Sequence, residues 1–173
     1  SVLGALAASP LALLAQGVGE KAQRPGAGAG GGVFGFSEID HGVDVDHQVA
    51  PGYRAEVLIR WGDPVLPDAP ALDPRHQSAA AQVRQFGYNN DFVGYIPLPL
   101  GSDNAEIGLL CINHEYTDEQ LMFPGLGEYD AGFTKATREV AEIEMACNGG
   151  TIIEIRKEGG RWRVVEGSPY ARR

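Results

Sequence analysis

The residues best suited to chemistry lie within one segment, residues 106–119, whose centre reads LLCINHEYT. Cys111, Asn113 and Glu115 alternate along it, so they share one face if the segment is a β-strand, and His114 lies on the other face. A thiolate, an amide and a carboxylate delivered to one point suit a transition metal beside a hard cation. A buried strand that ends in a polar turn is the alternative that this spacing leaves open.

A second group of polar side chains precedes another apolar run. Residues 86–91 read FGYNND, a composition typical of a turn, because Asn and Asp tolerate left-handed backbone and bond to their own backbone. Asn89, Asn90 and Asp91 could also supply oxygen ligands to a hard cation. Composition is compatible with both interpretations.

Short strands are the elements that must position these side chains. Residues 107–112 and 92–98 are apolar runs rich in branched or aromatic residues, which is typical of strands. Residues 53–61 alternate apolar with polar side chains, which predicts a half-buried strand. Residues 151–156 and 162–165 flank the sequence KEGG, so they are expected to pair as a hairpin.

One helix is expected, over residues 134–146, where apolar residues recur at helical spacing. Thr134 is the predicted N-cap, and the sequence NGG at 148–150 is expected to end the helix. Residues 64–80 and 121–127 are rich in Pro, Ala or Gly, which indicates loops.

The composition indicates a globular protein with many turns. The chain has 173 residues, 24 of them Gly and 11 Pro, with 43% hydrophobic and 21% charged residues. The net charge of −9 and the scattered basic residues argue against a nucleic-acid partner. An acidic chain that acted on an anionic substrate would need bound cations to neutralise that substrate.

The N-terminal part divides by composition into two segments. Residues 1–16 contain an apolar run that is too short to span a bilayer and resembles the hydrophobic core of a truncated signal peptide. An amphipathic N-terminal helix is the alternative. Residues 17–32 have the Gly- and Ala-rich composition of a flexible linker. We therefore expect the ordered domain to occupy residues 33–173.

A cluster of acidic residues and histidines follows the linker but predicts no site. Its spacing matches no metal site with a physical rationale, so we expect an exposed, solvated loop. The residues are Asp40, His41, Asp44, Asp46 and His47.

Four segments together resemble the PhoX family of bacterial alkaline phosphatases. They are HQVAPGY at 47–53, VLIRWGD at 57–63, FGYNNDFVG at 86–94 and LLCINHEYT at 109–117, and they occur in the family's order. The resemblance runs from about Asp46 to the C-terminus. It implies a secreted enzyme, exported by the twin-arginine route to the periplasm or beyond, that hydrolyses phosphate esters.

The resemblance also implies an all-β fold, a β-propeller that carries iron and calcium at one end of its channel. Cys111 is then a ligand of iron, and Glu115 binds or bridges cations. The family's arginine for phosphate and several of its carboxylates have no counterpart in this sequence. Residues expected to orient ligands or substrate are Asn89, Asn90, Asp91, Asn113 and His114.

Family chains are much longer than this one, so residues 33–173 would form only an N-terminal portion of the propeller, with one short helix. No repeat of fixed period is visible, so the propeller is implied by the resemblance alone. Such a portion should expose strand edges, be unstable alone and show no phosphatase activity. The complete protein is expected to be a monomer without a membrane span.

The two cysteines, Cys111 and Cys147, allow two interpretations. An oxidising compartment would permit a disulfide between them. The resemblance instead implies a thiolate at Cys111, and Cys147 then looks like a small core residue on the helix.

Two other functions remain open at this stage. One is a non-catalytic propeller-type binding protein of the wider family, and the other is an exported structural domain. Iron in the complete protein would favour the phosphatase over both.

Overall fold

The computed structural model describes residues 35–126 and 134–173. The chain divides into two compact units, Ser1–Arg54 and Ala55–Arg173. The predicted signal segment and linker lie outside the described residues. In the first unit, residues 35–54 form no helix or strand, and nearly all of them are exposed. The Asp and His residues at 40–47 are all exposed there, which confirms the expected solvated loop.

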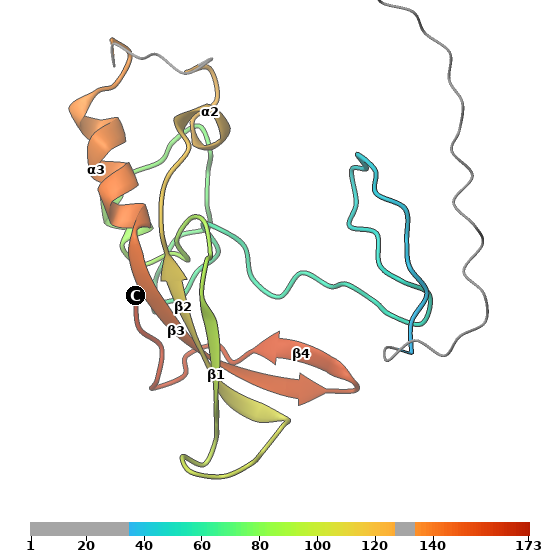
Figure 1. Cartoon of the computed structure of the whole chain (residues 1–173). Coiled ribbons are helices and arrows are strands. Elements are labelled where there is room, and N and C mark those ends of the chain that lie inside the picture. Colours follow the sequence, from blue (N-terminus) through green and yellow to red (C-terminus); the bar gives the residue numbers. More distant parts are fainter. Residues whose placement is uncertain (1–34, 127–133) are drawn as a thin grey trace, which may run out of the picture. The chain divides into compact units, whose positions relative to one another are not determined.

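The second unit is built on one antiparallel sheet of four strands in the order β1-β2-β3-β4, joined as a meander (Figure 1). The sheet is open, with β1 and β4 at its edges. The mainly β character was predicted from the sequence. The strands are β1 (Val93–Pro97), β2 (Ile107–His114), β3 (Gly149–Glu158) and β4 (Arg161–Val164).

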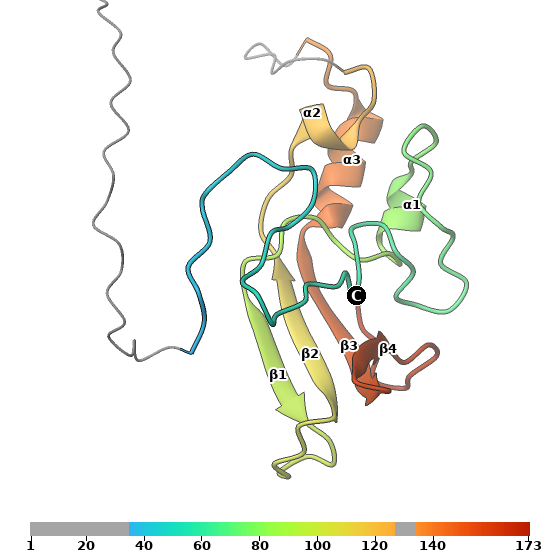
Figure 2. The same ribbon diagram turned by 90° about the vertical axis from the view of Figure 1, so that its right-hand side faces the viewer.

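Within the described residues, three short helices accompany the sheet: α1 (Ala79–Gln82), α2 (Glu119–Met122) and α3 (Arg138–Cys147). In Figures 1 and 2, α2 and α3 lie together beyond the end of β2 and the start of β3. None of the helices in the described ranges has the length and apolar character needed to cross a bilayer.

The predicted helix at 134–146 begins later than expected. Thr137, and not Thr134, is its N-cap, because the Thr137 hydroxyl accepts a hydrogen bond from the backbone N–H of Val140 at 3.2 Å. At the other end, Gly149 has φ 117° and already belongs to β3. The glycines after the helix therefore turn the chain directly into the sheet.

The predicted strand at 53–61 is wrong. Residues 55–60 form no β-ladder with other described residues, and the half-buried side chains there are the adjacent Leu58 and Ile59, while Val57 is 73% exposed. A strand needs a hydrogen-bonded neighbour, and alternating side chains do not provide one. Leu58 and Ile59 instead pack onto the core of the sheet from a loop.

The core covers one face of the sheet. Phe86, Ile112, Ile153 and Ile155 form a buried cluster that Trp162 and the loop side chains complete. Their positions follow from the register, in which Leu110 faces Ile153 and Gly108 faces Ile155 across β2 and β3. A second cluster joins α3 to α2 through Met122, Ile143 and Cys147.

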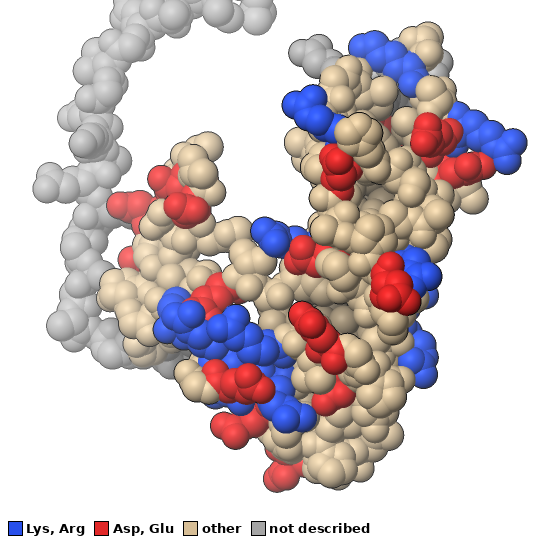
Figure 3. Space-filling view, turned by 180° about the vertical axis from the view of Figure 1, so that it is seen from behind, with Lys and Arg blue, Asp and Glu red and all other residues tan. Residues whose placement is uncertain are grey.

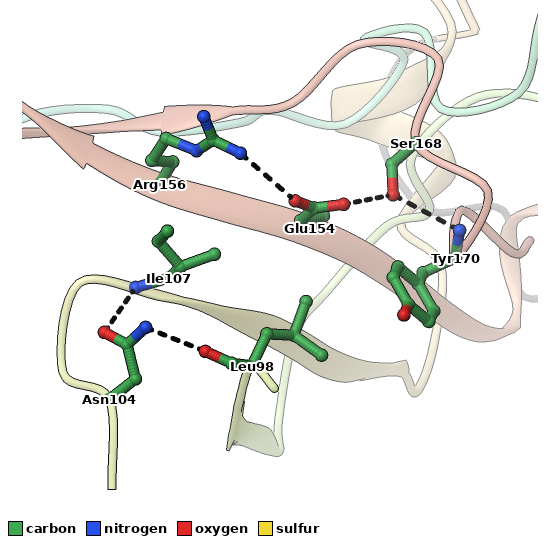
Figure 4. Close-up of polar contacts among 7 residues, drawn as sticks. All are labelled: Leu98, Asn104, Ile107, Glu154, Arg156, Ser168 and Tyr170. Carbon is green, nitrogen blue, oxygen red and sulfur yellow. Dashed lines mark hydrogen bonds and ion pairs between the residues drawn. The ribbon is translucent and has the colours of Figure 1, made fainter. Parts of the chain in front are cut away.

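Two polar side chains fix the connections at the edges of the sheet (Figure 4). Asn104 closes the β1–β2 connection, since its Nδ2 donates to the Leu98 carbonyl at 2.7 Å and its Oδ1 accepts from Ile107 N–H at 3.3 Å. On β3, the buried Glu154 carboxylate accepts a 2.6 Å hydrogen bond from the Ser168 hydroxyl. That bond holds the segment after β4 against the sheet.

Charged side chains of both signs are interspersed on the face in Figure 3. Arg161 on β4 pairs with Glu56 at 3.4 Å, and Arg156 on β3 lies 3.9 Å from Glu154. These two basic residues of the hairpin therefore have acidic neighbours.

Candidate functional site

The end of β2 is bound to the turn at residues 89–91, called here the strand-end turn. The Asn113 Oδ1 accepts hydrogen bonds from the backbone N–H groups of Asp91, at 3.2 Å, and Phe92. The Glu115 N–H donates to the Asn89 carbonyl at 3.0 Å. Asn89 has φ 46°, the left-handed conformation that its residue type predicted. The structure therefore brings together the two polar groups that the sequence singled out.

His114 holds the same junction from inside the protein. Its ring is buried, with the residue only 3% exposed, and it packs edge-on against Phe86 at a centroid distance of 4.8 Å. Nδ1 lies 2.9 Å from Asn90 Oδ1, and Nε2 lies 2.7 Å from Thr151 Oγ1. Burial, with a smaller contribution from the positive Arg173, lowers the pKa of His114 to about 4, so the imidazole is neutral at pH 7.

Cys111 lies in the middle of β2 on the opposite face of the sheet from His114. It is half-buried, and its partner across the β1–β2 ladder is Gly94, which has no side chain to cover the thiol. Cys111 and Asn113 line an open hollow of about 440 Å³ together with Phe92 and Arg172. Cys111 therefore contributes to the wall of an open hollow.

Two carboxylates flank the junction. Asp91 and Glu115 are both exposed. Cys111 and Glu115 are four residues apart on an extended chain, which puts roughly 13 Å between their Cα atoms. That separation is too large for the thiolate and the carboxylate to bind one ion. The described residues contain no group of three or more His, Cys, Asp or Glu side chains that could hold a metal.

Arg173 is a basic residue close to these elements, but its guanidinium serves the fold. It donates to the carbonyls of Gln85 at 2.6 Å, Ala146 at 2.6 Å and Cys147 at 3.0 Å. Two of these carbonyls belong to the last turn of α3, where a cation is favoured by the helix dipole. Arg173 is thus a helix cap and not a candidate phosphate ligand.

Comparison with known proteins decides the family. The family described as alkaline phosphatase PhoX matches residues 34–173. This chain belongs to the PhoX family. A solved structure, Pseudomonas fluorescens PhoX in complex with vanadate, a transition state analogue, has 35% sequence identity and a TM-score of 0.60.

The match covers 73% of this chain and 20% of the Pseudomonas fluorescens PhoX chain. This chain therefore spans about a fifth of the length of that PhoX. The comparison with curated proteins gives no match. The family resemblance inferred from four short segments is confirmed by the match over residues 34–173.

Sequence reasoning missed three residues that build this part of the PhoX chain: Gly87, Thr151 and Arg173. Gly87 donates its N–H to His114 Nε2 at 3.3 Å, and a Cβ at Gly87 would collide with the His114 ring and with the Cys147 carbonyl. Thr151 is 37 positions from His114 in the sequence. No local pattern marks such contacts, because they depend on strand register and loop packing.

Both cysteines are free thiols, so no disulfide joins them. Cys147 is fully buried in the cluster with Met122 and Ile143. Burial raises its thiol pKa to about 11. Cys147 therefore behaves as the small core residue that the sequence predicted.

Proposed function

We propose that the full-length protein to which these residues belong hydrolyses phosphate esters with bound iron and calcium. The observation that carries the proposal is the 35% identity to a PhoX that binds vanadate, a transition state analogue. Family membership over residues 34–173 supports the same chemistry. The chain corresponds to a fifth of the matched PhoX chain, so the activity is proposed for the whole protein.

The side chains of β2 and of the turn beside its end include types that bind iron and calcium. They would supply some of the ligands of a larger metal site. Cys111 presents a half-buried thiol beside an open hollow, and a thiolate is a soft ligand suited to iron. Glu115 and Asp91 present exposed carboxylates, which suit calcium. Because Cys111 and Glu115 cannot reach one ion, each would serve a different cation. Further ligands would have to come from outside the described residues.

The chain's own residues would bind and orient. When bound, the cations would polarise the phosphoryl group and neutralise its charge. Asn113 holds the strand-end turn through its two backbone contacts, and His114 holds it through Asn90. We propose that these contacts keep the oxygen donors of Asn89, Asn90 and Asp91 in place beside Glu115.

The architecture and location follow the same proposal. The four-stranded antiparallel meander has the form of one blade of a β-propeller, which would be completed by further blades. We also propose export by the twin-arginine route, directed by a signal that includes residues 1–16, and a monomeric complete protein. N-terminal sequencing of the secreted protein tests the signal, and retention of Leu11 in the mature form would contradict it.

The decisive experiment compares Cys111→Ser with Cys147→Ser in the full-length protein. Serine is a harder and far less acidic donor than cysteine, so Cys111→Ser should lose iron, and phosphatase activity should fall at least about tenfold. Calcium should remain, since oxygen ligands bind it. Cys147→Ser should keep its iron and show only a stability cost, because Cys147 lies in the core.

The measurements are metal content by elemental analysis and the rate of hydrolysis of a nitrophenyl phosphate monoester. Equal iron and equal rates in both variants would rule out ligation by Cys111. A wild-type protein that holds no iron and releases no phosphate would overturn the proposed function and would favour a non-catalytic binding protein.

A further inference from the structure

One hydrogen-bonded chain leads from the core to the strand-end turn. Thr151 is 1% exposed and lies on the same face of the sheet as His114. His114 faces Gly149 across the β2–β3 ladder, so no opposing side chain separates its ring from Thr151. The contacts run from Thr151 Oγ1 to His114 Nε2 at 2.7 Å, and from His114 Nδ1 to Asn90 Oδ1 at 2.9 Å.

These contacts allow one assignment of the protons. The Gly87 N–H can only donate, and it points at His114 Nε2 at 3.3 Å. Nε2 must therefore be the acceptor, and the ring proton sits on Nδ1, where it donates to Asn90 Oδ1. The Thr151 hydroxyl, at 2.7 Å, donates to the same nitrogen and shares its single lone pair with the longer Gly87 contact. A hydrogen bond to one ring nitrogen in this way fixes the role of the other.

The chain of bonds also fixes the side-chain amide of Asn90. Because its Oδ1 accepts from His114, the amide plane is set and the exposed turn is tied to a buried hydroxyl. The neighbouring backbone bonds from Asp91 to Asn113 and from Glu115 to Asn89 close the same junction. The carboxylates of Asp91 and Glu115 are carried by this one rigid unit.

We propose that Thr151 is a positioning residue for the proposed cation site: its hydroxyl holds the His114 ring, whose tautomer is set by the Gly87 N–H, and His114 in turn holds the Asn90 turn that carries the oxygen donors. This inference rests on the proposed function. Thr151 reaches no exposed atom itself, so it acts only through His114. Phe86 packs edge-on against the ring, and Gly87 approaches it so closely that a Cβ would not fit.

The test uses Thr151→Val and Thr151→Ser in the full-length protein. Valine has nearly the shape of threonine without the hydroxyl, whereas serine keeps the hydroxyl and loses the methyl group. Calcium affinity is measured by titration with calcium chloride, beside thermal stability, kcat and KM for a nitrophenyl phosphate monoester. We expect Thr151→Val to weaken calcium binding about tenfold or more, as is usual when a residue that orients a ligand is lost.

The expected pattern is specific. The kcat of Thr151→Val should recover at saturating calcium, and Thr151→Ser should retain the wild-type calcium affinity. A purely structural role would lower the thermal midpoint and leave calcium affinity unchanged, and that result overturns the inference. If Thr151→Val does not fold, Asn90→Ala removes the last hydrogen bond of the series, the one from His114 to Asn90. Unchanged calcium affinity in Asn90→Ala would also overturn the inference.

The two proposals fail in different ways. A wild-type protein that binds calcium and hydrolyses the ester, with a Thr151→Val variant that does both equally well, overturns the role of Thr151 alone. A wild-type protein that neither binds calcium nor hydrolyses the ester overturns both proposals.

Discussion

Acid should destabilise this protein through His114. The imidazole is buried, and its pKa falls from 6.5 to about 4, mainly because burial disfavours the charged form. In the unfolded chain His114 takes up a proton below about pH 6.5, whereas in the folded chain it stays neutral down to about pH 4. The unfolded state therefore binds more protons in this window, and stability falls as the pH falls through it.

The size of the effect follows from the two pKa values. At about 1.4 kcal/mol per pH unit, the full shift corresponds to roughly 3 kcal/mol, of which about 2.5 kcal/mol is lost by pH 4.5. Well above about pH 6.5, His114 is neutral in both the folded and the unfolded state. It then adds nothing to the pH dependence of the unfolding free energy. These figures are upper limits, because relaxation of the protein around a charged ring would reduce them.

The assay is urea unfolding of the full-length protein and of His114→Gln at about pH 7.5 and about pH 4.5, in the presence of a chelator so that metal release does not contribute. Glutamine can accept hydrogen bonds from Thr151 and Gly87 but does not titrate. We expect wild type to have a larger unfolding free energy than His114→Gln at about pH 7.5. That difference between the two proteins should shrink by up to about 2.5 kcal/mol at about pH 4.5. An equal loss of unfolding free energy in wild type and in His114→Gln on going to the lower pH would refute the reasoning.

Two further perturbations test the packing and the charges around the helices. Gly87→Ala should cost about 1–3 kcal/mol of unfolding free energy, because the added methyl group meets the His114 ring and a backbone carbonyl. Denaturant titrations measure the cost, and Gly35→Ala is the control because no atom lies within 4 Å of its new Cβ. Burial and the neighbouring Glu119 raise the pKa of Glu144 to about 7, so the Glu144 contribution to stability should fall as the pH rises from 4.5 to about 7, opposite in sign to the His114 contribution. Relative to wild type, Glu119→Gln should therefore be more stable at about pH 7 than at about pH 4.5, and a difference in unfolding midpoint that does not change with pH would contradict the assignment.

Local sequence was sufficient for the elements whose determinants are local. The hairpin of β3 and β4 turns at Gly159 and Gly160, which have φ 57° and 78°, as two adjacent glycines predicted. The strand at 107–112 was predicted from its apolar run and extends to His114. Asn89 adopts left-handed backbone because its own side chain favours it. In each case the deciding interactions lie within a few residues.

Local sequence was misleading where a partner was required. Residues 53–61 have a strand's alternation, yet residues 55–60 join no β-ladder among the described residues. The helix start moved to Thr137 because the hydroxyl that reaches Val140 N–H is the effective cap, and Thr134 satisfied the same residue preference. Propensity ranks the possibilities, and tertiary contacts select among them.

The sequence by itself determined the family, through segments such as LLCINHEYT at 109–117, and it predicts a group of site residues in Cys111, Asn113, Glu115 and the polar turn at 89–91. Only the tertiary structure decided how the group is held. The ladder register places Thr151 beside His114, and loop packing brings Gly87 and Asn90 to the same ring. Hydrogen bonds between segments far apart in sequence depend on the path of the whole chain. Short-range patterns in the sequence therefore do not predict them.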